Sequence, residues 1–361
     1  MIDFEPDEDQ ALIVETVRQF AENEVRPISR AADEAGSPPP EVLSAAHELG
    51  LVANALPESH GGGGERSALT GALIAEELGW GDMATCLAIL SPGLVGLPVG
   101  DFGSKVLKDA VLPGLLGPEF VPGALALVEP RFDSDPYRPR TTAKRDGDDF
   151  LIDGEKCQVP WLAGGRHVVI LASEAEGLAG FVVERDAAGL TATPEQKMGL
   201  SGLPTAALTL VGVRVPASAR LEADDQALRT LIDRGRIALS AAAIGTARAS
   251  FELARDYAKQ RETFGQPIAT RQAIAFKIAD MAIEIDGARL LVWEAAAALD
   301  RGEDASRRVR LAHDQTRRIT LQVTDGAVQV FGGHGYIRDY LPELHLRNVT
   351  GMTSFEALAL V

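Results

Sequence analysis

The stretch from Arg255 to Leu291 decides the fold: RDYAKQRETFGQPIATRQAIAFKIADMAIEIDGARLL. After Pro267, apolar residues recur at steps of three and four, which predicts one buried face of a long helix. These residues are Ile274, Ile278, Met281, Ile285 and Ala288. Gly265 and Pro267 interrupt the pattern, and the residues before them continue an earlier helix. The stretch therefore predicts two helices joined by a hairpin.

The hairpin has an unusual composition for a solvated turn. Arg261, Thr263 and Phe264 bring a cation, a hydroxyl and an aromatic ring together within four residues. On these residues alone we expect a helix end, where Arg261 complements the helix dipole and Phe264 enters the core. A ligand-binding role needs support from elsewhere in the chain.

A longer pattern supplies that support. Arg261-x-Thr-Phe-Gly, followed by Arg271-Gln272 and a long amphipathic helix, resembles the acyl-CoA dehydrogenase family, flavin-dependent enzymes that desaturate acyl-CoA thioesters. The block QVFGGHGY at 329–336 resembles the glycine-rich turn of the same family. The resemblance implies that both segments bind the FAD of a neighbouring subunit. The residues that it assigns to this cofactor contact are Arg261, Thr263, Phe264, Gln272, Gln329, Gly332 and Gly333.

Composition is typical of a globular protein that does not bind polyanions. The chain has 361 residues, 46% of them hydrophobic and 24% charged. Its 52 acidic and 35 basic residues give a net charge of −17, which argues against nucleic acid or anionic membranes as partners. Two cysteines are too few for a disulfide framework, and no metal site is predicted. The N-terminus lacks a signal pattern and no apolar run is long enough for a membrane span, so we expect a cytoplasmic protein.

Three regions differ in their periodicity. Residues 1–120 are predicted to be helical. Residues 121–220 contain short β-branched runs separated by turns, which predict strands, and residues 221–361 are predicted to form long helices with short connections. We therefore predict an α+β multidomain protein, with an N-terminal helical domain, a central antiparallel β-barrel or sandwich, and a C-terminal four-helix bundle. This order resembles the acyl-CoA dehydrogenase architecture.

The reaction that the resemblance implies needs a base, an electron acceptor and donors to the thioester oxygen. No amino acid accepts a hydride, so a flavin is required. By resemblance Glu356, in Phe355-Glu-Ala, is the base; Arg236 lies beside it and Asp233 contacts the CoA ester. From the residues alone, Glu356 is equally consistent with a surface carboxylate at the start of a helix, and Asp233 and Arg236 with an ion pair on a helix surface.

Several motifs depart from the family pattern. The family's Thr-Glu-Pro-x-Ala-Gly-Ser-Asp reads VEPRFDSD at 128–135, which keeps Ser134 as a flavin contact but replaces small residues with Arg, Phe and Asp. The segment GEKCQVP at 154–160 lacks the family's Trp and Thr. Trp161 lies three positions after Gln158, and on a strand it would point to the opposite face. Residues 357–360, ALAL, replace a cofactor-contacting Gly-Thr-x-Gln.

Every weakened motif belongs to the site that a subunit builds for its own flavin, whereas the motifs directed at a neighbour are intact. We therefore predict one subunit of a heterotetrameric acyl-CoA dehydrogenase that completes the FAD site of a partner, resembling the degenerate subunit of the steroid-CoA branch and acting on bulky or steroid side-chain CoA esters. Electron-transfer flavoprotein is the electron acceptor that the family implies. One alternative is a homotetramer with an altered FAD pocket and Glu356 as base. Another is a flavin-free binding or scaffolding protein.

Overall fold

The N-terminal region is a set of packed helices. In the computed structural model, which describes residues 6–175, 177–356 and 358–361, Asp7 starts the first helix through a capping box with Gln10. A π-helical turn at Ala21–Val25 and a 3-10 turn at Arg26–Ile28 separate this helix from the second, at the position of Pro27. The helices are α1 (Glu8–Phe20), α2 (Ser29–Ala35), α3 (Pro40–Glu48), α4 (Ala68–Gly81), α5 (Met83–Ile89), α6 (Gly93–Phe102) and α7 (Lys105–Leu115).

The middle region is one sheet with the spatial order β1-β4-β2-β3-β7-β6, and β5 pairs with β4 along its whole length, on the edge opposite to β1 and β2. Its strands are β1 (Leu125–Ala126), β2 (Thr142–Asp146), β3 (Asp149–Pro160), β4 (His167–Glu174), β5 (Gly177–Glu184), β6 (Leu190–Pro194) and β7 (Thr205–Pro216). Most pairs are antiparallel, as predicted, but β1 and β2 each pair with β4 in parallel. The sheet is therefore mixed. Periodicity gives the existence of strands but not their partners, which is why the parallel pairs were missed.

The C-terminal region contains three long helices and one short helix: α8 (Asp225–Gln260), α9 (Gln272–Asp300), α10 (Ser306–Phe331) and α11 (Pro342–Gly351). Helix α4 packs directly against α8. A Cβ on Gly245 would lie 1.9 Å from the Glu76 carbonyl oxygen, and one on Gly79 would lie 2.2 Å from that of Ala242. Glycine at both positions lets the two backbones approach closely, so α8 joins the bundle to the N-terminal helices.

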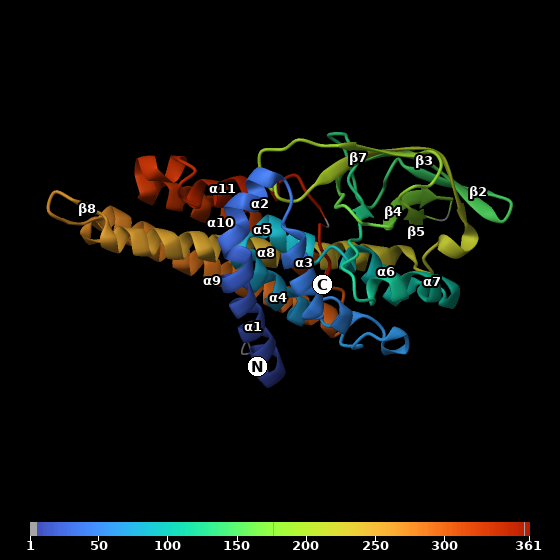
Figure 1. Cartoon of the computed structure of the whole chain (residues 1–361), viewed down its shortest axis with the longest axis horizontal. Coiled ribbons are helices and arrows are strands. Elements are labelled where there is room, and N and C mark those ends of the chain that lie inside the picture. Colours follow the sequence, from blue (N-terminus) through green and yellow to red (C-terminus); the bar gives the residue numbers. More distant parts are fainter. Residues whose placement is uncertain (1–5, 176, 357) are drawn as a thin grey trace.

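The long helices separate the two ends of the molecule. Figure 1 shows the sheet at one end and the hairpin of β8 (Glu262–Thr263) and β9 (Gln266–Pro267) at the tip of the opposite end, beyond α8 and α9. A hairpin between two helices is therefore confirmed. Within one chain, the hairpin and the sheet lie on opposite sides of the bundle.

Over the described residues, no single helix is long and apolar enough to cross a membrane. Helices α5 and α6 pass that test only as a pair bent by 42°. Residues Met83 to Val99 of this pair are buried in the protein core.

Candidate active site

The hairpin that follows α8 presents its side chains to solvent. Arg261 ends the helix with its backbone N–H donating to the Tyr257 carbonyl, and its exposed guanidinium makes no hydrogen bond or ion pair with any residue that the structure describes. Phe264 is 97% exposed and has a φ of +53°, a backbone conformation that is strained for an aromatic residue. Phe264 therefore does not enter the core. Strain and exposure at one aromatic residue are typical of a position that a partner or ligand covers.

The glycine-rich turn lies beside the root of this hairpin. Tyr257, one helical turn before Arg261, stacks on Phe331 with ring centroids 4.1 Å apart. Its hydroxyl lies 2.9 Å from His334 Nδ1, at hydrogen-bond distance. The structure thus gathers the seven residues assigned to a neighbour's FAD at one end of the bundle. Gln272 begins α9, Gln329 lies in the last turn of α10, and both are exposed.

The two central glycines of the turn leave open space around their backbone. Gly332 has a φ of +59°, which favours glycine, but a Cβ added to either Gly332 or Gly333 would meet no described atom within 4 Å. Gly333 does not even have a positive φ. An exposed turn without side chains leaves room for another molecule to approach the backbone.

A second cluster forms where α8 meets the segment after α11. Arg236 Nε and Nη2 donate to the two carboxylate oxygens of Glu356 at 3.0 and 3.1 Å. Arg236 Nη1 donates to the Tyr137 hydroxyl at 2.5 Å and lies 3.7 Å from Asp233 Oδ1. The pKa of Arg236 is raised because, although burial lowers it, the bonds and charge of Glu356 outweigh that effect. The structure therefore brings together the predicted base and both predicted substrate contacts.

The simpler interpretations describe this cluster only in part, because Asp233 and Arg236 do form an ion pair on α8 at 3.7 Å, but that pair is buried. Glu356 follows α11 without starting a helix, and its carboxylate is only 25% exposed because it faces Arg236. The Asp233 side chain is 2% exposed, and burial raises the pKa of its carboxyl group. Asp233 Oδ1 has no hydrogen-bond partner among the described residues, so an acceptor remains available there.

The Ser134 loop is held by its own side chains. Ser134 Oγ accepts a hydrogen bond from the Glu129 backbone N–H at 3.1 Å, and Arg131 Nη2 lies 3.4 Å from a carboxylate oxygen of Glu129. Lys156 is fully buried, donates to Glu129 at 3.3 Å, and has its pKa lowered to about 8 by burial. Phe132 projects into solvent. The loop thus keeps Ser134 but carries charged and aromatic side chains where the family has small residues.

The segment where the family places its Trp and Thr is also altered. Gln158 has a φ of +58°, and its backbone N–H donates to both oxygens of Glu195 at 3.2 and 3.0 Å. One of the two register shifts of β3 lies between Lys156 and Val159, and the strand ends at Pro160. Strand alternation therefore does not place Trp161, which packs under the Arg185 guanidinium 3.6 Å from its ring centroid.

A cavity of about 520 Å³ opens beside Gln158, between the sheet and α11. Its wall includes Glu195, Lys197, Arg347, Ser354 and Phe355. A carboxylate that occupies the Gln158 N–H removes a donor and adds a negative charge, both unfavourable for an electron-accepting ring that becomes more anionic on reduction. With Pro160 in place of Thr, this half of the pocket does not fit FAD as the family's pocket does.

Residues 358–361 turn inward. Leu358, Ala359, Leu360 and Val361 are 0–4% exposed, although the resemblance expects a cofactor-contacting Gly-Thr-x-Gln at 357–360. Ala357, the first of the substituted positions, lies outside the described residues. Over the described part of the chain, no group of three or more His, Cys, Asp or Glu side chains is placed to hold a metal ion.

Sequence reasoning missed three features of this region: Tyr137 on Arg236, Glu195 on Gln158, and the inward course of residues 358–361. Tyr137 and Glu195 carry no local pattern, because their partners lie 99 and 37 residues away in the chain. The run LALV did carry a signal, since four consecutive apolar residues indicate burial.

Comparison with known proteins agrees with this architecture. Residues 7–119, 124–213 and 225–356 match the N-terminal, middle and C-terminal domains of acyl-CoA dehydrogenase. The chain is 34% identical to a probable acyl-CoA dehydrogenase, YngJ, of Bacillus subtilis, over 96% of this chain and 94% of the relative. It is 32% identical to cyclohexane-1-carbonyl-CoA dehydrogenase of Geobacter metallireducens, over 98% and 95%.

Solved structures agree as well. A glutaryl-CoA dehydrogenase from Mycobacterium smegmatis in complex with FADH2 superposes with a TM-score of 0.89 at 27% identity, covering 98% of this chain and 92% of that one. Three domain matches in the same order span nearly the whole chain. The chain therefore belongs to the acyl-CoA dehydrogenase family, which dehydrogenates acyl-CoA with FAD.

Proposed function

We propose that this chain is one subunit of a heterotetrameric acyl-CoA dehydrogenase and completes the FAD site of a partner subunit of the same family. Arg261, Thr263, Phe264 and Gln272 from the hairpin, with Gln329 and the glycines at 332 and 333, reach into the partner's site. FAD, when bound there, supplies the hydride acceptor for the desaturation.

The observation that carries this proposal is the separation of the two sets of residues. Apart from the half-buried Thr263, the partner-directed residues lie exposed at one end of the bundle. There no described residue pairs with the Arg261 side chain, and no described atom lies within 4 Å of a Cβ at Gly332 or Gly333. The residues of the chain's own site lie near the sheet. There the Gln158 N–H donates to Glu195, and Arg236 donates to both carboxylate oxygens of Glu356. The groups at the hairpin end are therefore available to a ligand, whereas those near the sheet are hydrogen-bonded to each other.

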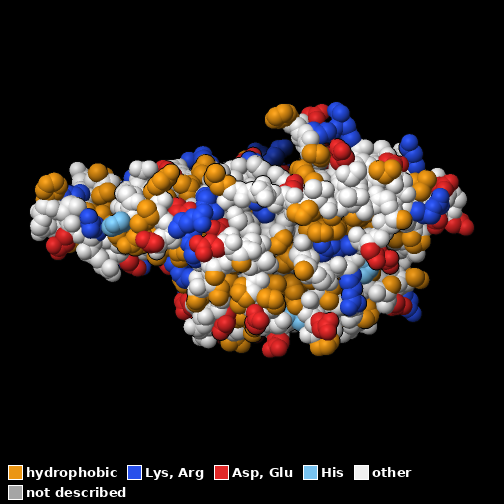
Figure 2. Space-filling view, turned by 45° about the horizontal axis from the view of Figure 1, so that its top comes forward, with side chains coloured by type: hydrophobic (Ala, Val, Ile, Leu, Met, Phe, Trp, Pro, Cys, Tyr) orange, Lys and Arg blue, Asp and Glu red, His pale blue; other side chains and the backbone are white. Residues whose placement is uncertain are grey.

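Exposed apolar side chains support an assembly. Figure 2 shows hydrophobic side chains along the protruding helical arm. The exposed large hydrophobic residues of the hairpin, α9 and the glycine-rich turn are Phe264, Phe276, Ile283, Leu290, Leu291, Tyr336 and Ile337. Apolar residues in such number on one arm are typical of a surface covered by another subunit.

One observation favours the second candidate, a homotetramer in which this chain binds FAD in an altered pocket. Asp233, Arg236 and Glu356 lie together, and Ser134 lies on the same loop as Tyr137, which contacts Arg236. In that case Glu356 removes the Cα proton, and Arg236 must release at least one of its oxygens first.

The acyl group that we propose is bulky, such as a ring-bearing or steroid side-chain CoA ester, with electron-transfer flavoprotein as the electron acceptor. The likeness to a relative named for a cyclic acyl group supports this class. A chain-length series and a steroid-CoA, assayed on the assembled complex, would test it. Preference for butyryl-CoA would contradict the bulky class.

Two substitutions separate the two assemblies. In the proposed complex, Arg261→Ala removes a charge-assisted contact to the cofactor, so FAD affinity should fall roughly ten- to a hundred-fold, equivalent to about 1.5–3 kcal/mol. Glu356→Gln in this chain should leave turnover unchanged, because the partner's base performs the reaction. Both are measured as FAD content and acyl-CoA turnover of the purified complex.

Arg214→Ala is the matched control, because Arg214 is an exposed arginine of the sheet whose ion-pair partners among the described residues are Asp146 and Asp149 alone. It should change neither FAD content nor turnover. If Glu356→Gln abolishes turnover while FAD is retained, or if this chain purified alone carries FAD and activity, the homotetramer is correct.

A further inference from the structure

The four residues Leu358–Val361 are packed inside the subunit, and the residues around them leave space for their side chains. Leu358, Ala359 and Val361 join the hydrophobic cluster of α4 and the long helices. Leu360 joins the separate cluster that includes α6, α7 and the start of α8. The segment therefore fills the space between two hydrophobic clusters.

Two contacts fix Val361. Arg234 Nη1, on α8 between Asp233 and Arg236, donates to the Val361 carbonyl oxygen at 3.1 Å. On the other side, a Cβ at Gly71 of α4 would lie 2.7 Å from Val361 Cβ. Glycine is a poor helix former, and in α4 it leaves the space that Val361 takes. The helix sequence is thus adapted to the presence of the segment.

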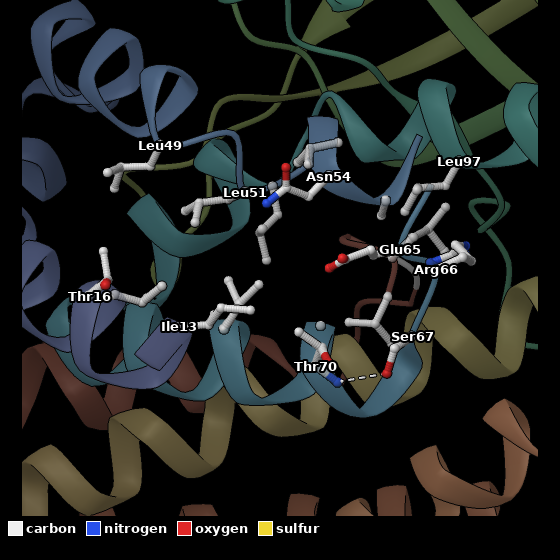
Figure 3. Close-up of a pocket in the computed structure, with 18 of the residues that line it drawn as sticks. Ile13, Thr16, Leu49, Leu51, Asn54, Glu65, Arg66, Ser67, Thr70 and Leu97 are labelled. Carbon is white, nitrogen blue, oxygen red and sulfur yellow. Dashed lines mark hydrogen bonds between the residues drawn. The ribbon is translucent and has the colours of Figure 1, made fainter. Parts of the chain in front are cut away.

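Apolar space continues beyond the segment. A cavity of about 220 Å³ has Leu360 and Val361 in its wall, together with Leu12, Ile13, Leu51 and Ile74. Figure 3 shows Ile13, Leu49, Leu51 and Leu97 around the open space, with Asn54 and Glu65 among them. Segment and cavity together form an apolar tract, and the segment enters it two residues after Glu356.

A substrate of this family places its thioester beside the base and its acyl chain in apolar surroundings. The carbon that loses its proton must lie within hydrogen-bond reach of the carboxylate. An acyl chain bound in this subunit must therefore start at Glu356 and continue into the apolar interior. In this structure the apolar interior reached by the chain two residues after Glu356 is filled by the side chains of residues 358–361.

We propose that Leu358–Val361 is a built-in occupant of this subunit's acyl-chain site, an inference that rests on the proposed function and explains how the subunit's own site stays closed to acyl-CoA. An acyl chain can enter only if the segment leaves. Exposing three buried aliphatic side chains to water should weaken acyl binding more than about a hundred-fold relative to an empty site.

The first experiment titrates the full chain with octanoyl-CoA and with CoA alone in a calorimeter. The wild-type chain should bind octanoyl-CoA no more tightly than CoA. The triple variant Leu358→Ser, Leu360→Ser, Val361→Ser should expel the segment and bind octanoyl-CoA at least about ten-fold more tightly than CoA. Leu208→Ala, a buried leucine of the sheet cluster, is the control for general loosening and should behave as wild type.

A second measurement does not depend on the fold of the triple variant. In a Cys157→Ser background, Val361→Cys places a thiol in the segment, and Cys86 remains buried and unreactive. Labelling of the introduced thiol should be slow, unaffected by CoA, and at least about ten-fold faster with saturating octanoyl-CoA, because the acyl chain displaces the segment.

The inference is overturned if wild type prefers octanoyl-CoA over CoA ten-fold or more, if the folded triple variant gains no acyl affinity, or if saturating octanoyl-CoA leaves the labelling rate unchanged. These readouts use the chain without FAD or partner. Failure of the proposed function would instead appear in the FAD content and turnover of the complex, so the two failures are distinguishable.

Discussion

The contact between Gly71 and Val361 allows a direct thermodynamic test of where residues 358–361 lie. Gly71 is the fourth residue of α4, and a Cβ there would lie 2.7 Å from Val361 Cβ, 2.8 Å from its Cγ1 and 3.2 Å from its Cα. Real Cβ atoms essentially never approach closer than 3.0 Å. Gly71→Ala therefore forces either the helix or the segment to move.

Two opposing effects set the magnitude. In an open helical position, replacing glycine with alanine raises the free energy of unfolding by about 0.5–1 kcal/mol. Overpacking in a filled interior lowers it by about 1–3 kcal/mol. Gly71→Ala should thus lower the stability of the chain by as much as about 2 kcal/mol. After Val361→Gly has removed the colliding atoms, the same substitution should be stabilising, which gives a coupling energy of about 1–3 kcal/mol.

The assay is urea unfolding of the two single variants, the double variant and a control, Gly114→Ala. Gly114 lies in α7, where a Cβ would be no closer than 3.9 Å to Arg166 Nη1, so the control should gain stability. If Gly71→Ala stabilises the chain as Gly114→Ala does, with no coupling to Val361→Gly, the segment does not pack against α4 and the reasoning fails.

Three further outcomes are expected. Burial raises the pKa of Asp82 from 3.8 to about 6, so the folded state binds a proton that the unfolded state lacks, and stability falls as pH rises from 4 to 6. Asp82→Asn keeps the helix cap but cannot titrate. Its free energy of unfolding, measured in denaturant titrations, should therefore rise by up to about 3 kcal/mol relative to wild type between pH 4 and pH 6, and a difference that stays constant over this range would contradict the prediction. Burial lowers the pKa of His313 to about 4, so stability should fall as pH drops from 6.5 to 4, and His313→Gln should flatten this acid limb by up to about 3 kcal/mol. Gly287→Ala lies on the exposed face of α9, where a Cβ would meet no described atom within 4 Å, and it should stabilise the isolated chain yet weaken assembly measured by light scattering. Unchanged assembly would place this face of α9 outside the interface.

Helices, strands and the hairpin were predictable because each has a local signal. The three- and four-residue apolar steps after Pro267 indicate α9, and Gly265 and Pro267 indicate the turn before it. The proximity of Arg236 and Glu356 followed from resemblance alone, since 120 residues separate them and no spacing rule connects two such positions.

What remained unpredictable depends on the tertiary structure. The exposure of Phe264 contradicts its hydrophobic character, and only the position of the hairpin at the tip of the bundle explains it. In the sequence, the replacement of the family's Gly-Thr-x-Gln at 357–360 indicates only that cofactor-contacting residues are lost. In the structure residues 358–360 fill an interior space, so the departure has a structural consequence of its own.

The glycines fall into two groups according to what a side chain at each position would meet. At Gly71, Gly79 and Gly245 an added Cβ would collide with this chain itself, which explains glycine by the fold. At Gly287 and Gly333 an added Cβ would meet no described atom within 4 Å, and neither residue has a positive φ, so the fold of this chain gives no reason for glycine. Glycine inside a helix such as α9 lowers the stability of that helix. The contacts of another backbone or a ligand that approaches the glycine closely can offset this loss. The positions without an internal explanation lie on the exposed face of α9 and in the glycine-rich turn. This division supports the proposal that the chain is adapted internally around residues 358–361 and externally for a second molecule at the hairpin end.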